Sequence, residues 1–449
     1  MMSYYSQPGS IGAGELHSSS LQSRGTNWDR IFLWLVGTLS ATILLKIAQI
    51  QYLEIIYFVQ ILILLASSND YTVRIVPAYW FLAKQYLIFV TVALALSIYA
   101  TKRDFYYPDE LSTLKLPVVI TVSRILELLA SMVALLYIAS RIRSNLQDGR
   151  LVVRVYFWTG ALSAVYSILS YPLHVAGIAS LGTYLGSNRM RGFYNEGGPY
   201  GLYLISVFLV GIALYTLQWE NRRRLILAAI PLGMAFLGSQ SKAAFIAVLA
   251  ILLINGLLVK SFVQRFVLIT ALGAFLIAAY QVVDLAKAVR LYQTLSQAYE
   301  RASHRNAENP NFVYGRIAGA FLVPRMIAAH PFTGIGWGNY GIVRNDPEYR
   351  GASALVRGAD DPGLGLLGTM ADLGVPLTLF LVFILLLPFL LLRRRKAPLY
   401  MTNLALLQPI VHLFGGQLNL TYPWVITAFA LGLAYSPVLA ESVRSGEQR

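Results

Sequence analysis

The chain contains no cysteine and few charged residues. Without cysteine it can form no disulfide, no thiolate metal site and no thiol nucleophile. Charged residues make up 13 % of the 449 residues, about half the fraction usual in a soluble protein. The five histidines are scattered, and no two of them stand at the spacing of metal ligands. The sequence therefore excludes cysteine chemistry and predicts no metal site.

Long apolar runs fill the chain instead. Hydrophobic residues make up 57 % of the sequence, and the mean hydropathy is +0.59. A helix needs about 20 apolar residues to cross a membrane, and the runs predict about twelve such helices. We therefore expect an all-α integral membrane protein. The expected spans are residues 29–48, 51–67, 76–99, 116–140, 151–171, 199–218, 225–240, 241–259, 265–283, 364–392, 399–416 and 420–438.

The start of the chain is polar and rich in serine and glycine. Because no apolar core precedes Trp28, we expect no cleavable signal peptide. The expected organisation is a disordered cytoplasmic tail, nine transmembrane helices, a long periplasmic loop, three more transmembrane helices and a second cytoplasmic tail. The corresponding ranges are 1–27, 28–283, 284–363, 364–440 and 441–449.

The net charge of +15 comes mostly from Lys and Arg residues that flank the expected spans. Such residues stay on the cytoplasmic side of a membrane. With about twelve spans, the clusters share one side with the N-terminus. We therefore expect both termini in the cytoplasm and the chain in a bacterial inner membrane. The charge indicates contact with anionic lipid, not nucleic acid. The clusters are Arg24 and Arg30, Arg141, Arg143 and Arg150, Arg222 to Arg224, Lys260 and Arg265, and Arg393 to Lys396.

The expected periplasmic loop, 284–363, has about 80 residues, too many for a simple connector. Apolar residues at helical spacing predict an amphipathic helix near 285–300, lying on the outer membrane surface. A second helix is expected from about Arg316 to Ala329, kinked or interrupted at Pro324. The loop is therefore expected to be a structured part of the protein.

Cations on the expected outer side are not explained by topology. Lys242 borders two apolar spans, and an ionisable group there is a functional candidate. A group of Arg and Lys at the outer surface suits an anionic ligand such as a lipid-linked diphosphate, because Arg pairs with phosphate oxygens. The alternative is that the loop arginines extend to lipid headgroups. These loop arginines are Arg189, Arg191, Arg316, Arg325, Arg344, Arg350 and Arg357.

Glu196, Asp360 and Asp361 stand just before expected spans on the outer side. An acceptor hydroxyl needs a base near it, and each carboxylate could serve. Acidic residues also favour the first turn of a helix, so capping is the alternative for each. Within the fourth span, Arg124 and Glu127 lie one turn apart, and a structural ion pair is expected there.

A glycine-rich segment begins at His330 and has Gly at 334, 336, 338 and 341. Glycine permits positive φ and lets the backbone approach a neighbour or ligand closely. The segment therefore predicts a tight loop or a ligand contact. His330 directly precedes a proline, and capping or packing stands beside catalysis as its role.

The order of these motifs resembles the O-antigen ligase and Wzy-type polymerase superfamily. In that family a long outer loop carries an Arg followed by His-Pro-x-x-Gly-x-Gly-x-Gly-Asn-aromatic, which here corresponds to Arg316 and residues 330–340. The Ser-Gln-Ser-Lys stretch ending at Lys242 resembles the family's Ser-Arg element at the outer end of a span. Residues 191–203 resemble its motif after a shorter outer loop, and the whole likeness covers residues 185–380.

The resemblance implies a metal-independent glycosyltransferase without a cofactor. Such an enzyme transfers a glycan from undecaprenyl diphosphate to an acceptor hydroxyl on the periplasmic face. Ligases use lipid A-core as the acceptor, and polymerases use the next lipid-linked repeat unit. Ligases carry a His before the late span, whereas residues 359–365 contain none, and Lys242 stands where Arg is usual. The missing histidine favours a polymerase of O-antigen or exopolysaccharide, with a ligase as the alternative.

A transporter or flippase of lipid-linked sugars is an alternative from another class, because many spans and in-membrane charges fit one. Against it, no internal repeat is visible, and the cations gather at the outer end of the spans. The partners expected from the resemblance are an undecaprenyl-diphosphate-linked glycan and membrane lipid. A chain-length regulator is left open as a partner, and no nucleic acid is expected.

The charges and the resemblance together predict the site. Arg191, Lys242 and Arg316, with Arg189 beside them, are expected to surround the diphosphate and stabilise its leaving-group charge without a metal. Glu196 or Asp360 is expected to orient or deprotonate the acceptor hydroxyl. The remaining candidates, assigned to the acceptor or to the structure of the loop, are Arg325, His330 and Arg357.

Overall fold

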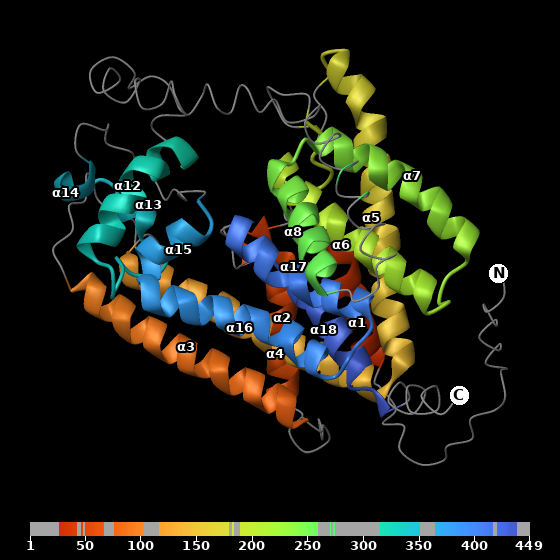
Figure 1. Cartoon of the computed structure of the whole chain (residues 1–449), viewed down its shortest axis with the longest axis horizontal. Helices are drawn as coiled ribbons and strands as arrows, with labels where there is room; N and C mark the ends of the chain where they lie inside the picture. The colour runs from red at the N-terminus through yellow and green to blue at the C-terminus, as the bar shows by residue number, and fades with distance from the viewer. Residues whose placement is uncertain are drawn as a thin grey trace.

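The computed structural model describes most of the helical part of the chain (Figure 1). The described residues are 27–42, 46–47, 50–66, 76–102, 116–178, 182–183, 189–258, 270, 273, 315–350, 364–415 and 420–437. The helices are α1 (Asn27–Leu39), α2 (Tyr52–Ala66), α3 (Pro77–Thr101), α4 (Pro117–Ser144), α5 (Leu146–Val175), α6 (Gly197–Thr216), α7 (Arg222–Ser239), α8 (Lys242–Leu258), α12 (Gly315–Ala329), α13 (Tyr340–Val343), α14 (Pro347–Arg350), α15 (Leu366–Leu373), α16 (Val375–Arg394), α17 (Leu399–Gly415) and α18 (Tyr422–Ala434).

Length and composition allow several of these helices to cross a membrane. Within the described ranges, five qualify singly, namely α3, α4, α5, α6 and α16. A sixth span results if α7 and α8, which meet at a bend of 120°, are counted together. The chain is therefore a multi-pass, all-α membrane protein, as expected. The count of about twelve spans stays a prediction.

The first and tenth expected spans have the wrong bounds. α1 ends at Leu39, and a short antiparallel pair, β1 (Lys46–Ile47) and β2 (Ile50–Gln51), follows it. Thr42, three residues beyond the end of α1, pairs with Phe193, and its hydroxyl donates to the Phe193 carbonyl at 2.9 Å. The expected span 364–392 is two helices, α15 and α16, because the chain breaks at Gly374 with φ of 76°.

Several expected regions lie outside the described residues. They are the two cytoplasmic tails, the ninth span and the amphipathic helix near 285–300, apart from single positions at 27, 270 and 273. The second expected loop helix is present as α12. It continues through Pro324, so of the two expected effects of this proline the interruption is wrong, and the kink stays a prediction.

α18 lies at the centre of the bundle. Every residue from Tyr422 to Leu433 is buried, and the helix packs along α4 and α17. Around it, α1 packs on α5, α16 on α17 and α3, and α6 on α7. A smaller core joins α12, α13, α14 and α15, which lie together at one side of the molecule in Figure 1. The fold is thus a membrane bundle with a small helical group beside one end.

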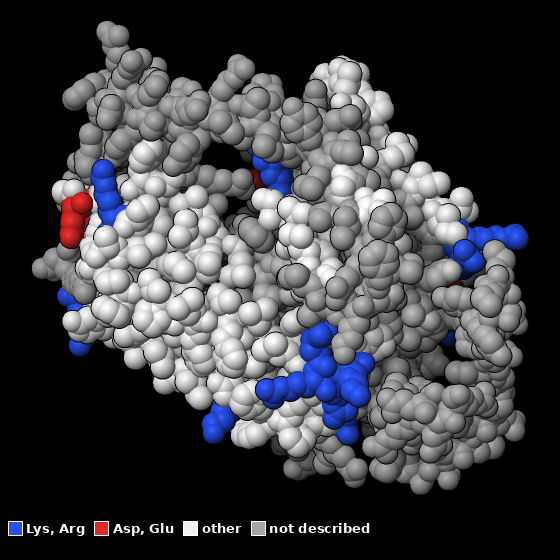
Figure 2. Space-filling view, viewed as in Figure 1, with Lys and Arg blue, Asp and Glu red and all other residues white. Residues whose placement is uncertain are grey.

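One end of the bundle is basic. The Arg395 guanidinium lies 3.8 Å from the centre of the Tyr435 ring, and Arg143 donates to the Tyr435 carbonyl. Tyr79, near the start of α3, packs against the same ring. Figure 2 shows basic side chains gathered in a patch, and residues 393 to 396 at the end of α16 are exposed. The positive-inside rule predicts that this end faces the cytoplasm.

The segments expected on the outer side share the opposite end. Ser97, near the end of α3, accepts a hydrogen bond from the Trp337 amide, and Thr121, near the start of α4, donates to the Trp337 carbonyl. Phe193 pairs with Thr42 beyond the end of α1. The helix directions thus place both outer loop segments away from the basic end, which agrees with the predicted sidedness.

Candidate functional site

The starts of α6 and α8 meet at the expected outer end. The Ser241 hydroxyl donates to the Gly198 carbonyl at 2.9 Å and accepts from the Ala244 amide at 3.1 Å. Gly201 permits this contact, because a Cβ there would lie 2.4 Å from the Ser241 Cβ. The N-terminus of a helix carries partial positive charge and free N–H groups. Two helices therefore direct their positive ends to one corner.

Lys242 is the first residue of α8 and is exposed. The turn before it depends on Gln240, which has φ of 47° and ψ of 36°, a left-handed conformation unusual for this residue type. This turn separates α7 from α8 and leaves the Lys242 side chain at the surface of the corner. The sequence predicted a functional cation here, and the geometry leaves its ammonium group accessible to a ligand.

Arg189 and Arg191 lie in the segment that passes this corner. The Met190 amide donates to the Gly238 carbonyl at 2.9 Å, and Arg189 Nε donates to the Ser239 carbonyl at 3.2 Å. The Nε atom would also lie 3.2 Å from a Cβ at Gly197, so Arg189 stands between the end of α7 and the start of α6. The structure thus brings Arg189, Arg191 and Lys242 to one corner.

A buried tyrosine anchors this segment. Tyr194 is fully buried, and its hydroxyl donates to the Ser40 carbonyl at 2.8 Å. Its ring packs against Tyr200 and Tyr203 of α6 and against Tyr422 of α18. The anchor fixes the backbone that carries the two arginines, and the sequence alone did not predict it.

Glu196 precedes α6 at the N-cap position, yet its side chain makes no capping hydrogen bond. It is exposed, with φ of −142° and ψ of 156°. Of its two expected roles, capping by the side chain does not occur in this structure. Glu196 therefore stands exposed at the start of α6, one of the two helix N-termini that meet at this corner.

The glycine-rich segment packs on the junction of α15 and α16. The Ile335 and Gly336 amides donate to the carbonyls of Ala371 and Asp372 at 2.9 and 3.0 Å. The Val375 amide donates to the Pro331 carbonyl at 2.8 Å. Of the four glycines, those at 334, 336 and 338 have positive φ, as the sequence predicted, whereas the one at 341 lies in α13. This packing accounts for the glycines without a ligand.

Gly334 gives a direct test of that packing. Its φ is 65°, and a Cβ there would lie 2.3 Å from the Asp372 carbonyl oxygen. We expect Gly334→Ala to lower the melting temperature in detergent, since the left-handed conformation alone costs about 1–2 kcal/mol and the clash adds to it. Gly233→Ala in α7 is the control, because a Cβ there meets nothing within 4 Å. Equal melting temperatures for wild type and Gly334→Ala would contradict this packing.

His330 and Arg325 both bind Tyr349. His330 Nε2 lies 2.5 Å from the Tyr349 hydroxyl, and an Arg325 Nη atom donates to the Tyr349 carbonyl at 3.0 Å. Tyr349 is buried in the small core of α12 to α15. These contacts favour the loop-structuring role among the two expected for His330 and Arg325.

The predicted ion pair between Arg124 and Glu127 is confirmed, with an N–O distance of 3.0 Å. Arg124 also lies beside the glycine-rich segment, since its Cγ would be 3.3 Å from a Cβ at Gly338. The Gly338 amide donates to an Asp372 carboxylate oxygen at 2.9 Å. The contact of Arg124 in α4 with the glycine-rich segment was not predicted, because a contact between residues far apart in the sequence leaves no local pattern.

Some of the predicted site residues are not placed by the structure. Arg357, Asp360 and Asp361 lie outside the described residues. Arg316 lies in the first turn of α12, but its side chain is not among those described.

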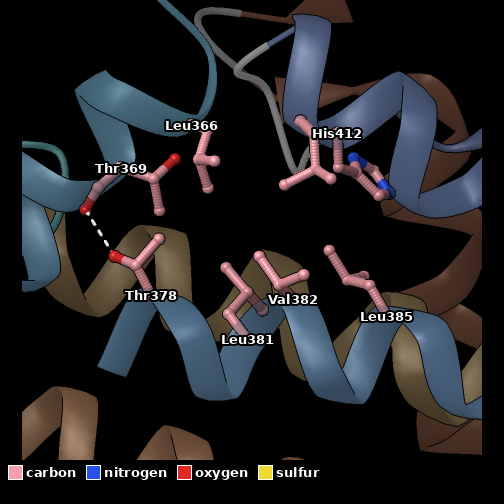
Figure 3. Close-up of a pocket in the computed structure, with 8 residues that line it drawn as sticks. Leu366, Thr369, Thr378, Leu381, Val382, Leu385 and His412 are labelled. Atoms are coloured by element: carbon pink, nitrogen blue, oxygen red, sulfur yellow. Dashed lines mark hydrogen bonds between the residues drawn. The ribbon is translucent and has the colours of Figure 1, made fainter. Parts of the chain in front are cut away.

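A narrow pocket, lined mainly by apolar residues, lies between α15, α16 and α17 (Figure 3). The Thr378 hydroxyl donates to the Thr369 carbonyl at 3.1 Å and so ties α16 to α15. His412 lies at the other end of the pocket, with its ring packed on Trp424. No role was predicted for His412, and its burial and ring contact indicate a packing residue.

Comparison of the chain with protein-family models and with curated proteins gives no match. The likeness to the O-antigen ligase and polymerase superfamily therefore stays a prediction from the sequence motifs alone.

Proposed function

We propose that this chain is a glycosyltransferase that polymerises oligosaccharide repeat units carried on undecaprenyl diphosphate. It would act on the periplasmic face of a bacterial inner membrane and build a surface polysaccharide, O-antigen or exopolysaccharide. The observation that supports this most is the corner where α6 and α8 begin. There, two helix N-termini joined by Ser241 lie beside Lys242, Arg189 and Arg191. Such a corner suits a diphosphate.

The chemistry follows from the charge that develops. A hydroxyl of the acceptor repeat unit attacks the anomeric carbon of the donor glycan, and the bond from that carbon to the diphosphate oxygen breaks. The leaving undecaprenyl diphosphate gains negative charge. Fixed positive groups that face this charge stabilise the transition state. Lys242, Arg191 and Arg189 take this role, with Arg316 as the expected contribution of α12.

The acceptor hydroxyl must lose a proton in the same step. Glu196 is the described carboxylate beside the corner, and it is exposed rather than engaged in capping. Asp360 is the second candidate for the base. A carboxylate within hydrogen-bond reach of the hydroxyl takes up its proton as the glycosidic bond forms.

The acceptor distinguishes a polymerase from a ligase. Residues 359–365 contain no histidine where ligases carry one, which favours a repeat unit over lipid A-core as the acceptor. The test is a deletion strain, with gels of its surface glycans and its lipid-linked intermediates. Loss of long chains with single repeat units still exported supports a polymerase. Long chains that stay on the carrier indicate a ligase, and repeat units trapped on the cytoplasmic side indicate a flippase.

The proposed reaction uses cationic side chains where other transferases use a metal ion. We therefore expect EDTA to leave the rate of the purified enzyme unchanged, measured as lipid-linked polymer formed in proteoliposomes. In the part of the chain that the structure describes, no three His, Asp or Glu side chains form a group that could hold a metal ion. Activity lost in EDTA and restored by a divalent ion would contradict the metal-free mechanism.

A further inference from the structure

A groove runs between α1 and α5, away from the corner described above. Its volume is about 1140 Å³ including its open side, and its lining includes Trp34, Arg150, Arg154, Trp158 and Leu162. The lining belongs to the face that the bundle turns outward, since Trp34 is 49 % and Leu162 is 62 % exposed. The groove is therefore a surface that a lipid molecule can enter from the side.

The groove is basic at one end and apolar along the rest. Arg150 and Arg154 lie one turn apart in the first part of α5, near the basic end of the bundle. Trp158 and Leu162 follow them at one-turn intervals on the same face of α5. Tryptophan is enriched where the polar headgroups of a membrane meet its apolar core. The order of cation, tryptophan and aliphatic residue matches a phospholipid lying along the helix.

The cations at this end outnumber the carboxylate that pairs with them. Arg154 Nε binds a Glu220 oxygen at 2.9 Å, and an Arg224 Nη atom lies 3.9 Å from the other oxygen. Arg150 donates to the Trp219 carbonyl at 3.0 Å. Burial raises the pKa of Glu220, but hydrogen bonds from the Asn221 amide and Trp158 and the nearby Arg154 lower it overall.

Arg154 and Arg224 thus share one ionised carboxylate, and Arg150 binds a backbone carbonyl instead, which leaves net positive charge. Each guanidinium has five N–H donors, so the contacts to Trp219 and Glu220 leave donors for a further acceptor. The Arg154 side chain is 42 % exposed, whereas that of Glu220 is 4 % exposed. A ligand that enters the groove thus meets the cation before it meets the carboxylate.

We propose that this groove binds an anionic glycerophospholipid from the leaflet at the basic end of the bundle. Its phosphate lies at Arg150 and Arg154, and an acyl chain lies along Trp34, Trp158 and Leu162. The site is separate from the proposed diphosphate site, so it stands whether or not the chain is a polymerase. Charge complementarity selects an anionic headgroup over a zwitterionic one.

The first test is native mass spectrometry of the full chain with phosphatidylglycerol or phosphatidylethanolamine. We expect the wild type to prefer phosphatidylglycerol, and Arg150→Gln/Arg154→Gln to reduce that preference about tenfold, since charge-assisted hydrogen bonds are lost. Equal retention of the two lipids by the wild type, or an unchanged preference in the double variant, would overturn the proposal.

A second variant leaves the contacts of Arg154 and Glu220 intact. Thr159→Trp places a large ring in the groove, and we expect it to abolish the preference for phosphatidylglycerol. Leu169→Trp is the matched control, because Leu169 is 68 % exposed on α5 outside the groove lining. A photocrosslinker at Thr159 should label lipid. Labelling of another segment of this chain or of a second copy would refute lipid as the occupant.

Discussion

Replacing Lys242 by alanine is expected to abolish chain extension while the protein accumulates normally in the membrane. Lys242 is exposed at the start of α8, so its loss leaves no buried group unpaired and costs little stability. The proposed transition state, in contrast, loses a fixed positive charge next to the leaving diphosphate. Loss of one such group lowers turnover by about a hundredfold or more. Polymer should then be undetectable on a gel of surface glycans.

The measurement compares polymer length and protein level in cells that carry each variant. Lys102→Ala is the matched control, because Lys102 is also exposed and follows α3 at the same end of the bundle. Lys242→Arg should retain polymer, since it keeps the positive charge and Arg is usual at this place in the superfamily that the sequence motifs resemble. Arg316→Ala is expected to behave like Lys242→Ala. Polymer of wild-type length from either alanine variant would refute the diphosphate role of that residue.

Replacing Arg141 by alanine is expected to cause the largest loss of stability. The Arg141 guanidinium lies between two carboxylates at the basic end, 2.9 Å from Asp148 and 3.7 Å from Asp29. Tyr137 also donates to Asp29. The Arg141 side chain is 9 % exposed, Asp29 1 % and Asp148 4 %. Removal of one partner from a buried charge group costs about 3–5 kcal/mol, because the remaining charges stay buried without compensation.

A triple variant separates this cause from simple loss of packing. In Asp29→Asn/Arg141→Met/Asp148→Asn no buried charge of the group remains, and Met fills part of the space of the arginine. We expect the triple variant to melt above Arg141→Ala in detergent, although it carries more substitutions. Arg393→Ala, exposed at the end of α16, is the control for a lost cation. If the triple variant is the less stable one, buried charge is not the cause.

The sequence predicted the helices well where an apolar run decides them. The expected spans 76–99 and 199–218 correspond closely to α3 and α6. The break at Gly374 was missed, because it depends on the Phe332 carbonyl, which a Cβ at Gly374 would approach to 2.4 Å. The end of α1 at Leu39 was also missed, because the residues after it pair with Phe193, which is distant in the sequence. Contacts between distant segments do not appear in a local hydropathy pattern.

The candidate site shows the same division. The residue types at Lys242 and Arg189 indicated an anion site and that at Glu196 a base, and the structure places all three at the corner where α6 and α8 begin. The roles of Ser241 and Tyr194 could not be predicted, since they depend on the close approach of α6 to α8 and to the segment before it. For Arg141 the sequence predicted only a position on the cytoplasmic side. Its ion pairs with Asp29 and Asp148 could not be predicted, because packing of the helices brings Asp29 to it.

The packing of the glycine-rich segment also bears on how a polymer could grow. Backbone hydrogen bonds at Ile335, Gly336 and Val375 fix this segment to the α15–α16 junction, and Trp337 is held by α3 and α4. A segment tied to four helices behaves as a rigid wall rather than as a hinged cover. If the proposed polymerase activity is correct, the growing product would have to move past this fixed segment, because the segment has no hinge by which to open after each addition.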